Sequence, residues 1–464
     1  MRVSPADRRV GLAVGRRDAC AVVLGPENEV LARAVLPDDA NDYDPPDARP
    51  AATVATLLDA LGEVAAPEHV GRVVLAAALT RPLHRPAECA RVGVLRIGAP
   101  ATASVPPFSG WPARLTAAVR GPVALVAGGH EYDGRVAAPL DRAAVEAFAR
   151  ACRTRRDPVA AVAVTAVHAQ ANGAHEQEAA VLLADALGPD VPVVTGGDEG
   201  GLGLLERENA AILDAALAPT ARRVLDEVGA VLAERGLVDE LYLVHGDGTV
   251  FPAQSAARRP LRTVGALHSS ARVGGVHLAG EATVVVVDDD GRRVRVSAAV
   301  EGWPQESGRL VEVLGIRTNL REVRVTEAPA DAVGPTTARA VAGLAGPLVL
   351  VRNARRLPDL LLPGRVLRPD DAPFAAAIGA AVGEAAGTVD RIFWIGERSR
   401  AEVVAEARRL AAEAAIRAGA DPRRVRIGTV AETLMTYVPT SCVRIRVRAV
   451  GPVLTVGTER GGEQ

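Results

Sequence analysis

The sequence predicts an α/β fold of two lobes, and the main evidence is a strand pattern that occurs twice. Residues 10–37 read as three apolar strands joined by two tight polar turns, and residues 282–313 repeat this order. Elsewhere apolar strands alternate with amphipathic helices, which is typical of an α/β protein. A chain of 464 residues, 48% of them hydrophobic, is long enough for about two to four domains with real cores.

The remaining elements follow in order along the chain. Between the two repeats the pattern predicts helices at 52–64, 174–187 and 204–235, a helix capped by Asp141, and strands at 72–78, 92–97, 123–126, 159–167, 191–195 and 241–244. Pro219 should break or restart the long helical stretch. The second repeat predicts strands at 283–287, 294–300 and 310–313, and the last eighty residues predict strands at 391–395, 425–430 and 443–450 around a helix at 400–418.

The last helix has clear start and stop signals. Ser399 and Glu402 have the spacing of a capping box, and Gly419 stands where a left-handed residue ends a helix. In the final strand Arg444, Arg446 and Arg448 alternate with apolar residues, so we expect the arginines to protect one face or edge of the sheet from unwanted pairing.

We therefore expect an N-terminal lobe at 1–195, a second lobe at 196–385 and a small α+β domain at 386–464. A three-strand meander opening each half is typical of the duplicated actin-like/ribonuclease H-like two-lobed ATPase fold, here with a small C-terminal α+β appendage. In that fold the first turn of each meander offers backbone N–H groups to a phosphate chain, which requires glycine and small hydroxyl residues.

Composition excludes several functional classes. The net charge of −2, with acids and bases interspersed, argues against nucleic acid or a membrane surface as partner. All 54 basic residues are arginine, so lysine Schiff bases and phosphate-loop lysines are excluded. The four cysteines are far apart and indicate neither a disulfide framework nor a zinc site. With no export signal and no long apolar run, we expect a soluble cytoplasmic protein.

Four segments carry a resemblance to a known family. They are the Gly128–Arg135 stretch with its trailing Pro139-Leu140-Asp141, Leu204–Ala210, Asp247-Gly248-Thr249 and Gly315–Asn319. In this order and spacing they resemble the hydantoinase A/oxoprolinase family, and the similarity runs over most of the chain. The first two domains would then be a hydantoinase A N-terminal-type lobe and a hydantoinase/oxoprolinase-type second lobe.

The resemblance implies ATP-dependent hydrolysis of a cyclic amide such as a hydantoin, 5-oxoproline or a lactam, with ATP and Mg²⁺ as cofactors. It also implies a subunit that phosphorylates the amide, often beside a second subunit that completes hydrolysis. Family members that use ATP resemble Asp-x-Gly-Gly-Thr-x-Thr-Asp at both meander turns. Each lost Asp removes a hard oxygen ligand, and each lost Gly or Thr removes space or a donor that phosphates need.

Both turns of this chain depart from that pattern. The first keeps Gly15 but has Ala13 in place of the leading Asp, followed by Arg16 and Arg17. The second keeps Asp288 and Gly291, but Arg292, Arg293 and Val294 replace the hydroxyl residues and Arg295 the closing Asp; the family's later Gly-rich segment reads Thr326–Asp331. We therefore predict degenerate phosphate loops at Gly15, Arg16, Arg17, Asp288, Gly291 and Arg292, and no bound cofactor.

Four arginines of these turns have two interpretations: Arg16, Arg17, Arg292 and Arg293. They could form a new site for a phosphate or carboxylate, because guanidinium groups bind such anions bidentately. Alternatively they are solvated turn residues, or fill the cleft while paired with Asp18, Asp289 and Asp290, and alternating charges in hairpin turns favour this second interpretation.

Other polar residues are weaker candidates for a site. His130 and Asp133, with Glu131, could bind a metal or substrate, although charged Gly-rich loops are commonly turns, and we predict no metal. His245 and Asp247 follow a strand at the end where α/β ligand clefts form, so they are substrate candidates. No catalytic constellation can be read from spacing.

Two functions of different classes remain. The chain is either a pseudoenzyme, retained as a non-catalytic or regulatory subunit, or an active cyclic-amide hydrolase with atypical or no ATP use. The altered turns favour the first, because a backbone phosphate cradle does not tolerate bulky side chains. A protein of this kind is expected to work as a homo-oligomer or with a hydantoinase-family partner subunit.

Overall fold

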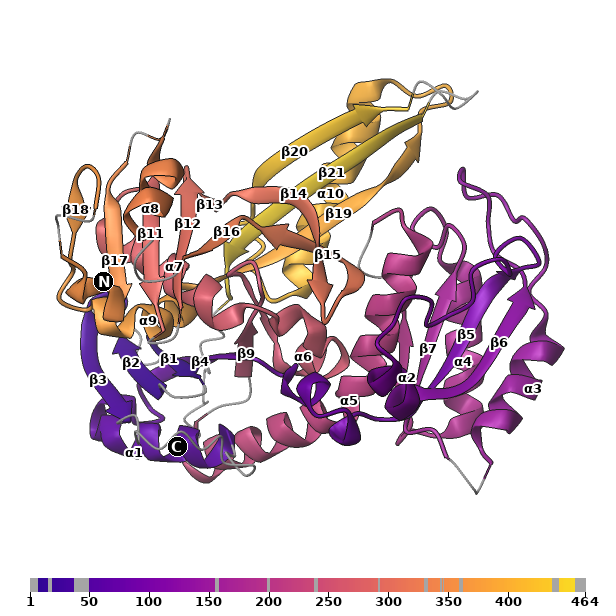
Figure 1. The fold of residues 1–464 in the computed structure, drawn as a ribbon, viewed down its shortest axis with the longest axis horizontal. Helices are drawn as coiled ribbons and strands as arrows, with labels where there is room; N and C mark the ends of the chain where they lie inside the picture. Colours follow the sequence, from indigo (N-terminus) through magenta and orange to yellow (C-terminus); the bar gives the residue numbers. More distant parts are fainter. Residues whose placement is uncertain are drawn as a thin grey trace, which may run out of the picture.

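The computed structural model describes residues 7–15, 19–36, 50–154, 158–197, 201–237, 241–290, 293–328, 333–342, 344, 346–358, 362–435 and 442–454. Its strands form a nine-stranded sheet, a six-stranded sheet, a four-stranded sheet and a two-stranded hairpin (Figure 1). Within these ranges no helix combines the length and the apolar character needed to cross a bilayer.

The first meander is present as predicted. It consists of β1 (Arg8–Val14), β2 (Ala19–Leu24) and β3 (Val30–Leu36), paired antiparallel in sequence order. On the other side of β1 the sheet continues in parallel with β4 (Val70–Ala77) and β9 (Leu241–Val244). Helix α1 (Pro50–Leu61) packs on β1, β2 and β3, and Val54, Leu57, Leu58 and Leu61 are the buried residues expected from its amphipathic pattern.

The second meander is only partly as predicted. Strands β11 (Val284–Asp289) and β12 (Val294–Val300) form the expected antiparallel pair, and β17 (Leu348–Arg352) joins β11 in parallel as β4 joins β1. The third strand, however, is not 310–313. Strands β13 (Trp303–Pro304) and β16 (Val325–Ala328) pair with β12 instead, while β18 (Val366–Leu367) extends the other side.

Residues 310–313 belong to a separate hairpin of β14 (Glu306–Val313) and β15 (Ile316–Val323). The prediction failed because β14 buries neither face: its side chains are half-buried or exposed along its whole length. The chain turns at Glu301 and Gly302, both of which have positive φ. It then pairs with β12 through Trp303 and Pro304 only, and leaves the six-stranded sheet.

Two helices lie between the two main sheets. Helix α9 (Ala375–Val382) packs on β1, β2 and β4, while α7 (Ala266–Ala279) packs on β11 and β17, and the two helices contact each other closely (Figure 1). Their contact is reciprocal: a Cβ on Gly274 would lie 1.9 Å from the Ala375 carbonyl oxygen, and one on Gly379 would lie 1.8 Å from the Ser270 carbonyl oxygen. Glycine is therefore required at both crossing points.

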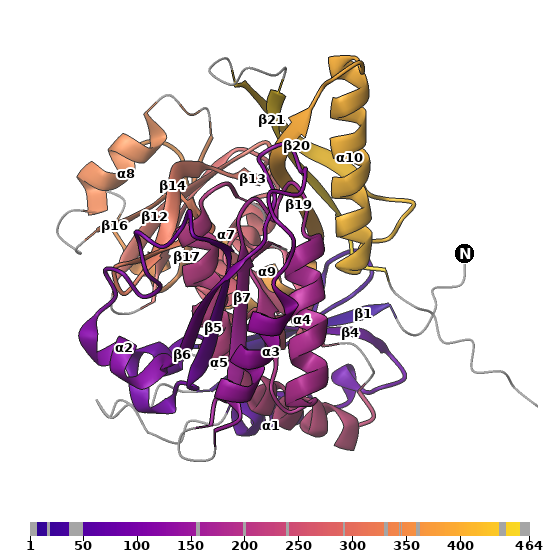
Figure 2. The ribbon, with the colours of Figure 1, turned by 90° about the vertical axis from the view of Figure 1, so that its right-hand side faces the viewer.

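The four-stranded sheet is parallel and has the order β6-β5-β7-β8. Its strands, at or near the predicted positions, are β5 (Val92–Ala99), β6 (Arg120–Ala127), β7 (Ala161–Ala166) and β8 (Val193–Thr195). Helices α3 (Arg142–Cys152) and α4 (Ala174–Leu187) cover one face (Figure 2), and α2 (Ala113–Val119) and α5 (Leu204–Glu234) pack on the other.

Helix α5 corrects the prediction that Pro219 breaks this segment, because the helix runs through it for 31 residues. A proline removes one helical hydrogen bond, which packing can offset. Here Leu217 is buried against the four-stranded sheet, and Leu225 is buried against β9 and β10 (Val250–Pro252), so both halves are fixed.

The C-terminal strands extend the first sheet. Strand β19 (Glu384–Trp394) pairs with β10 through Ala385 and Val250, then with β21 (Cys442–Pro452), which pairs with the edge strand β20 (Arg426–Leu434). Helix α10 (Arg400–Arg417) has the predicted capping box, and Gly419 beyond it has φ +99°. The nine-stranded sheet thus draws strands from all three expected domains, whose limits stay a prediction.

Candidate functional site

The two meander turns are the first place to look for a site. Ala13, the residue that replaces the leading aspartate, is buried at the end of β1, and Gly15 follows it half-buried. Arg16 and Arg17 of the first turn, and Gly291 and Arg292 of the second, lie outside the described residues. The second turn therefore offers one residue of the predicted set with a defined environment, Asp288.

Asp288 lies at the end of β11 and is fully buried. Its two carboxylate oxygens accept hydrogen bonds from the Arg352 guanidinium, Nε at 2.6 Å and Nη2 at 2.7 Å. Nδ1 of His268, on α7, lies 2.8 Å from the same carboxylate. Arg352 is held in place from the neighbouring strand, because β17 pairs with β11 and brings Arg352 opposite Asp289.

The surroundings of Asp288 and His268 determine the charge state of each side chain. Burial alone would raise the pKa of Asp288, but the Arg352 charge and the hydrogen bonds from His268 and Arg352 hold this pKa well below its usual range. Burial lowers the pKa of His268 more than the nearby carboxylate raises it. Asp288 is thus a carboxylate bonded to one arginine and one neutral histidine.

Two arginines just beyond Asp288, Arg293 and Arg295, are paired with acids. Arg293 donates to Glu327 at 2.6 Å, and Arg295 donates to Asp290 at 2.5 Å and to Glu327 at 3.2 Å. Arg293 is also largely solvent-exposed. Arg293 is therefore an exposed, paired turn residue, but its partner is Glu327 and not one of the aspartates named above. Arg16, Arg17 and Arg292 lie outside the described residues, so their role stays a prediction.

Asp288, the described residue of this turn that could act as a metal ligand in the predicted set, does not fit a Mg²⁺–phosphate group. Magnesium needs carboxylate oxygens that are free to coordinate it, usually beside retained water. The Asp288 oxygens instead face a guanidinium with which they form a bidentate, water-excluded ion pair. Elsewhere in the described ranges, no three His, Cys, Asp or Glu side chains converge as a metal site would require.

The second region of interest is the loop from His245 to Thr249, which joins β9 to β10. The Asp247 carboxylate accepts hydrogen bonds from Thr249 N at 2.9 Å and Oγ1 at 2.6 Å. The same carboxylate lies 3.2 Å from His245 Nδ1 and 2.8 Å from Arg448 Nη2. Gly248, with φ +94°, has no room for a side chain, because a Cβ there would lie 2.7 Å from Val273.

Helix α7 connects this loop with Asp288. Arg272, buried in α7, donates to the Asp247 carbonyl oxygen at 2.5 Å, and Ser269 donates to the Gly246 carbonyl oxygen. One turn earlier on the same helix, His268 contacts Asp288. Burial would raise the pKa of Asp247, but Arg448 and His245 hold it well below its usual range. The loop is therefore a rigid, charge-paired element.

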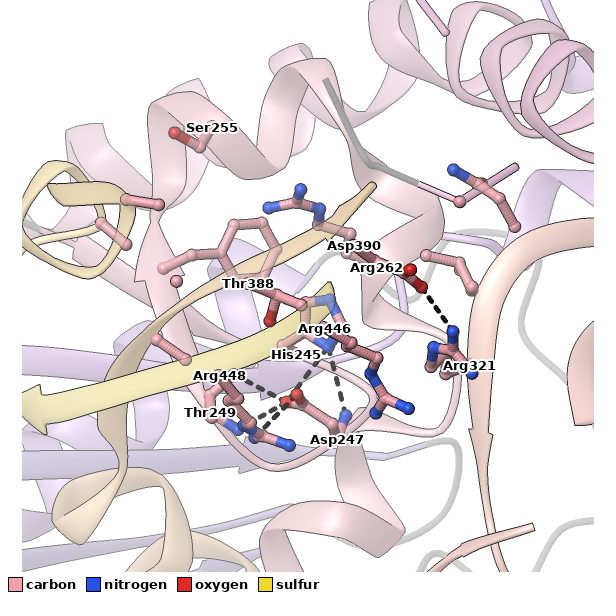
Figure 3. Close-up of a pocket in the computed structure, with 18 of the residues that line it drawn as sticks. His245, Asp247, Thr249, Ser255, Arg262, Arg321, Thr388, Asp390, Arg446 and Arg448 are labelled. Carbon is pink, nitrogen blue, oxygen red and sulfur yellow. Dashed lines mark hydrogen bonds and ion pairs between the residues drawn. The ribbon is translucent and has the colours of Figure 1, made fainter. Parts of the chain in front are cut away.

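His245 and Asp247 line a cavity of about 500 Å³ (Figure 3). Its other walls are β19 with α10, the arginines of β21, and the β14–β15 hairpin. Arg321 of the hairpin is bonded to Asp390 of β19, and Arg446 of β21 is bonded to Glu306 of the hairpin. The substrate candidates of the second lobe thus lie in a real cavity.

The other two candidates, His130 and Asp133, lie elsewhere. His130 is buried beside His175, with ring centroids 4.5 Å apart, and burial lowers its pKa. Asp133 accepts a hydrogen bond from Arg135 Nε at 2.7 Å and borders a separate cavity of about 180 Å³ between this loop and the C-terminal end of β19. The four substrate candidates therefore do not form a single site.

Sequence reasoning missed Arg352, His268 and Arg272 entirely, because nothing in their local sequence marks them. Arg448 was among three arginines expected to protect one face or edge of the sheet, and the edge alternative is wrong because β21 is an inner strand. Strand β21 lies between β19 and β20, and its three arginines pair with acids: Arg444 with Asp390 of the adjacent strand, Arg446 with Glu306 and Arg448 with Asp247. The alternation itself was the usable signal, since it placed three guanidinium groups on one face.

Two sheets that each open with a β-hairpin and a parallel third strand, with paired helices between them, define a two-lobed actin-like fold. Two solved structures share this fold. Nucleotide-free acetone carboxylase, from work on ATP-dependent acetone carboxylation, matches with a TM-score of 0.64 at 10% identity, covering 96% of this chain and 88% of that one. The ATP-dependent caprolactamase from Pseudomonas jessenii matches with a TM-score of 0.72 at 15% identity and the same coverages. At these identities the likeness concerns the fold alone.

The family evidence comes from the four-stranded domain. Residues 94–187 match the family model described as the hydantoinase/oxoprolinase N-terminal region. Over these residues, which contain the first of the four segments named above, the match confirms the resemblance to the hydantoinase A/oxoprolinase family. No curated protein sequence matches the chain.

Proposed function

We propose that this chain is a non-catalytic or regulatory member of the hydantoinase/oxoprolinase family whose nucleotide cleft does not bind Mg-ATP. The observation that carries the proposal is the buried ion pair of Asp288 with Arg352, completed by His268. The loss of the leading aspartate at Ala13 supports it from the other lobe.

The ion pair of Asp288 with Arg352 allows the loss of affinity for Mg-ATP to be estimated. For Mg²⁺ to bind Asp288, Arg352 would have to leave and remain uncompensated in a buried position. Breaking a buried pair in this way costs about 3–5 kcal/mol. Since about 1.4 kcal/mol is a tenfold change in affinity, Mg-ATP would bind at least about a hundredfold more weakly than at an open site.

A subunit without nucleotide chemistry needs another role. The nominal family reaction is ATP-dependent hydrolysis of a cyclic amide, and the caprolactamase that shares the fold is ATP-dependent by its title. We infer that this cytoplasmic chain acts in an assembly, as a homo-oligomer or beside a catalytic hydantoinase-family subunit.

Calorimetric titration with ATP and MgCl₂ tests the proposal. We expect no saturable binding below millimolar ATP. In a thermal unfolding assay we expect no stabilisation either, whereas a ligand at about 100 times its Kd would raise the free energy of unfolding by about 2.7 kcal/mol. Hydantoin, 5-oxoproline and a lactam should not be opened by the chain alone. Saturable binding below millimolar ATP would overturn the proposal, and ring opening by the chain alone would favour the alternative of an active hydrolase with atypical or no ATP use.

A further inference from the structure

Strand β20 is an edge of the nine-stranded sheet, because it pairs with β21 on one side and with no other strand of the described chain. None of its nine residues is buried. Figure 1 shows this end of the sheet, together with α10, projecting from the rest of the molecule. The backbone N–H and C=O groups on the outer side of such a strand can pair with another strand. The outer side of β20 is therefore accessible to a partner.

The sequence of β20 lacks most of the features that prevent edge strands from pairing. It contains no proline and no lysine, and its one irregularity is a bulge between Ile427 and Thr429, near the start of the strand. Two large apolar side chains are exposed instead, Ile427 at 38% and Leu434 at 56%. An exposed strand edge with apolar side chains favours pairing with another chain.

The two charged residues of β20 already have partners. Glu432 accepts a hydrogen bond from Arg400 of α10 at 2.6 Å. Arg426 donates to both carboxylate oxygens of Glu384, at 2.7 and 2.6 Å. A second strand beside β20 would therefore meet no unpaired charge of this strand.

The pairing of β20 with β21 shows a symmetry in the side chains of β20. Counted along β21, three pairs of β20 residues are equally distant from Ala431: Ile427 and Leu434, Thr429 and Thr433, and Val430 and Glu432. The bulge places Ile427 and Leu434 on the same face of the sheet, since they lie opposite Ala449 and Val443, which are six positions apart.

We propose that β20 pairs antiparallel with β20 of a second copy of this chain, about a two-fold axis at Ala431. In such a pair, residues equally distant from the axis lie opposite each other on one face of the joined sheet. Ile427 would lie opposite Leu434 of the partner subunit, so that the two exposed apolar side chains contact each other. The two threonines of the strand would likewise lie opposite each other, and cross-strand pairs of both kinds are favourable.

The charge pattern selects this register and favours a second copy as the partner. With the axis at Ala431, Glu432 lies opposite Val430 of the partner subunit, and no like charges meet. An axis at Glu432 would place two carboxylates opposite each other, which is destabilising. An axis at Val430 would place Ile427 opposite Glu432 of the partner subunit. In the register at Ala431 each half of β20 complements the other half, which is the property of a two-fold interface.

This inference gives a contact surface to the assembly proposed above, and it rests on that part of the proposed function. It does not depend on the state of the nucleotide cleft. Titration with Mg-ATP and measurement of the dimer can therefore fail separately.

Sedimentation velocity of the full chain at micromolar concentration tests the inference, and we expect a dimer. Leu434→Arg should raise the Kd of the dimer about tenfold, because the two-fold symmetry removes two apolar cross-strand contacts at once. Ile427→Glu should have a similar effect. The double variant Ile427→Glu/Leu434→Arg should recover most of the affinity, because opposite charges then face each other across the axis.

The matched control is Val181→Arg, which changes a valine of α4 that is 60% exposed and lies outside β20. It should leave the Kd unchanged. A wild-type chain that stays monomeric overturns the inference. A dimer that Leu434→Arg weakens no more than Val181→Arg does, or that the double variant fails to restore, overturns the pairing through β20 and leaves the proposed assembly intact.

Discussion

Replacing Arg352 with methionine would remove the charged partner of Asp288, a fully buried carboxylate at the second meander turn. Asp288 is fully buried and Arg352 is 7% exposed, so solvent cannot take over the lost hydrogen bonds at 2.6 and 2.7 Å. A buried charge left without its partner destabilises a protein by about 3–5 kcal/mol. We expect Arg352→Met to lower the free energy of unfolding by this amount.

Denaturant unfolding followed by circular dichroism measures the effect. The matched control is Arg365→Gln, which breaks the exposed pair of Arg365 with Glu281 and should cost less than about 1 kcal/mol. The double variant Asp288→Leu/Arg352→Met removes both charges and should recover most of the loss, because a buried pair is often replaceable by apolar residues. If Arg352→Met costs no more than Arg365→Gln, or if the double variant recovers nothing, the reasoning about this ion pair is wrong.

Three further predictions concern stability. Burial lowers the pKa of His268, so below about pH 6.5 the unfolded chain binds a proton that the folded chain does not. The free energy of unfolding should therefore fall, by up to about 1.4 kcal/mol per pH unit, as the pH decreases below about 6.5, and it should fall less in His268→Gln. Denaturant unfolding at about pH 7.5, 6.5 and 5.5 measures this dependence. Gly379→Val should collide with the Ser270 carbonyl and cost at least about 1–3 kcal/mol, whereas Gly229→Ala, with nothing within 4 Å, should be neutral or stabilising in the same assay. Ser399→Ala should cost about 1 kcal/mol through its lost cap, and an unchanged midpoint would contradict this.

A fourth prediction concerns assembly. Light scattering at micromolar concentration should give a mass above that of the 48.0 kDa monomer, because a chain without nucleotide chemistry is proposed to act in a complex. A monomer, together with no co-purifying homologue, would count against the proposed assembly.

Local patterns predicted many of the elements well. Alternating and continuous apolar runs predicted β1, β2, β11 and β12 correctly, because each of these strands has a face that is buried in the core. The capping box at Ser399 is equally local, since its two hydrogen bonds join residues three apart. Prediction failed at 310–313 and at Pro219, where contacts with distant segments, rather than the local pattern, decide the structure.

The candidate site also has features that the sequence indicates and features that only the three-dimensional structure reveals. The sequence by itself determined which residues stand at the two meander turns: Ala13 where the family it resembles has a leading aspartate, and arginines where that family has small hydroxyl residues. It also marked His245 and Asp247 as residues at the end of a strand. Only the tertiary structure decided that Asp288 forms an ion pair with Arg352 and a hydrogen bond with His268, which lie 64 and 20 positions away. It also decided that Arg446 and Arg448 of β21 meet a hairpin acid and a loop acid in the wall of a cavity. An ion pair depends on where two side chains meet in space, and that position is set by strand pairing and helix packing over the whole chain.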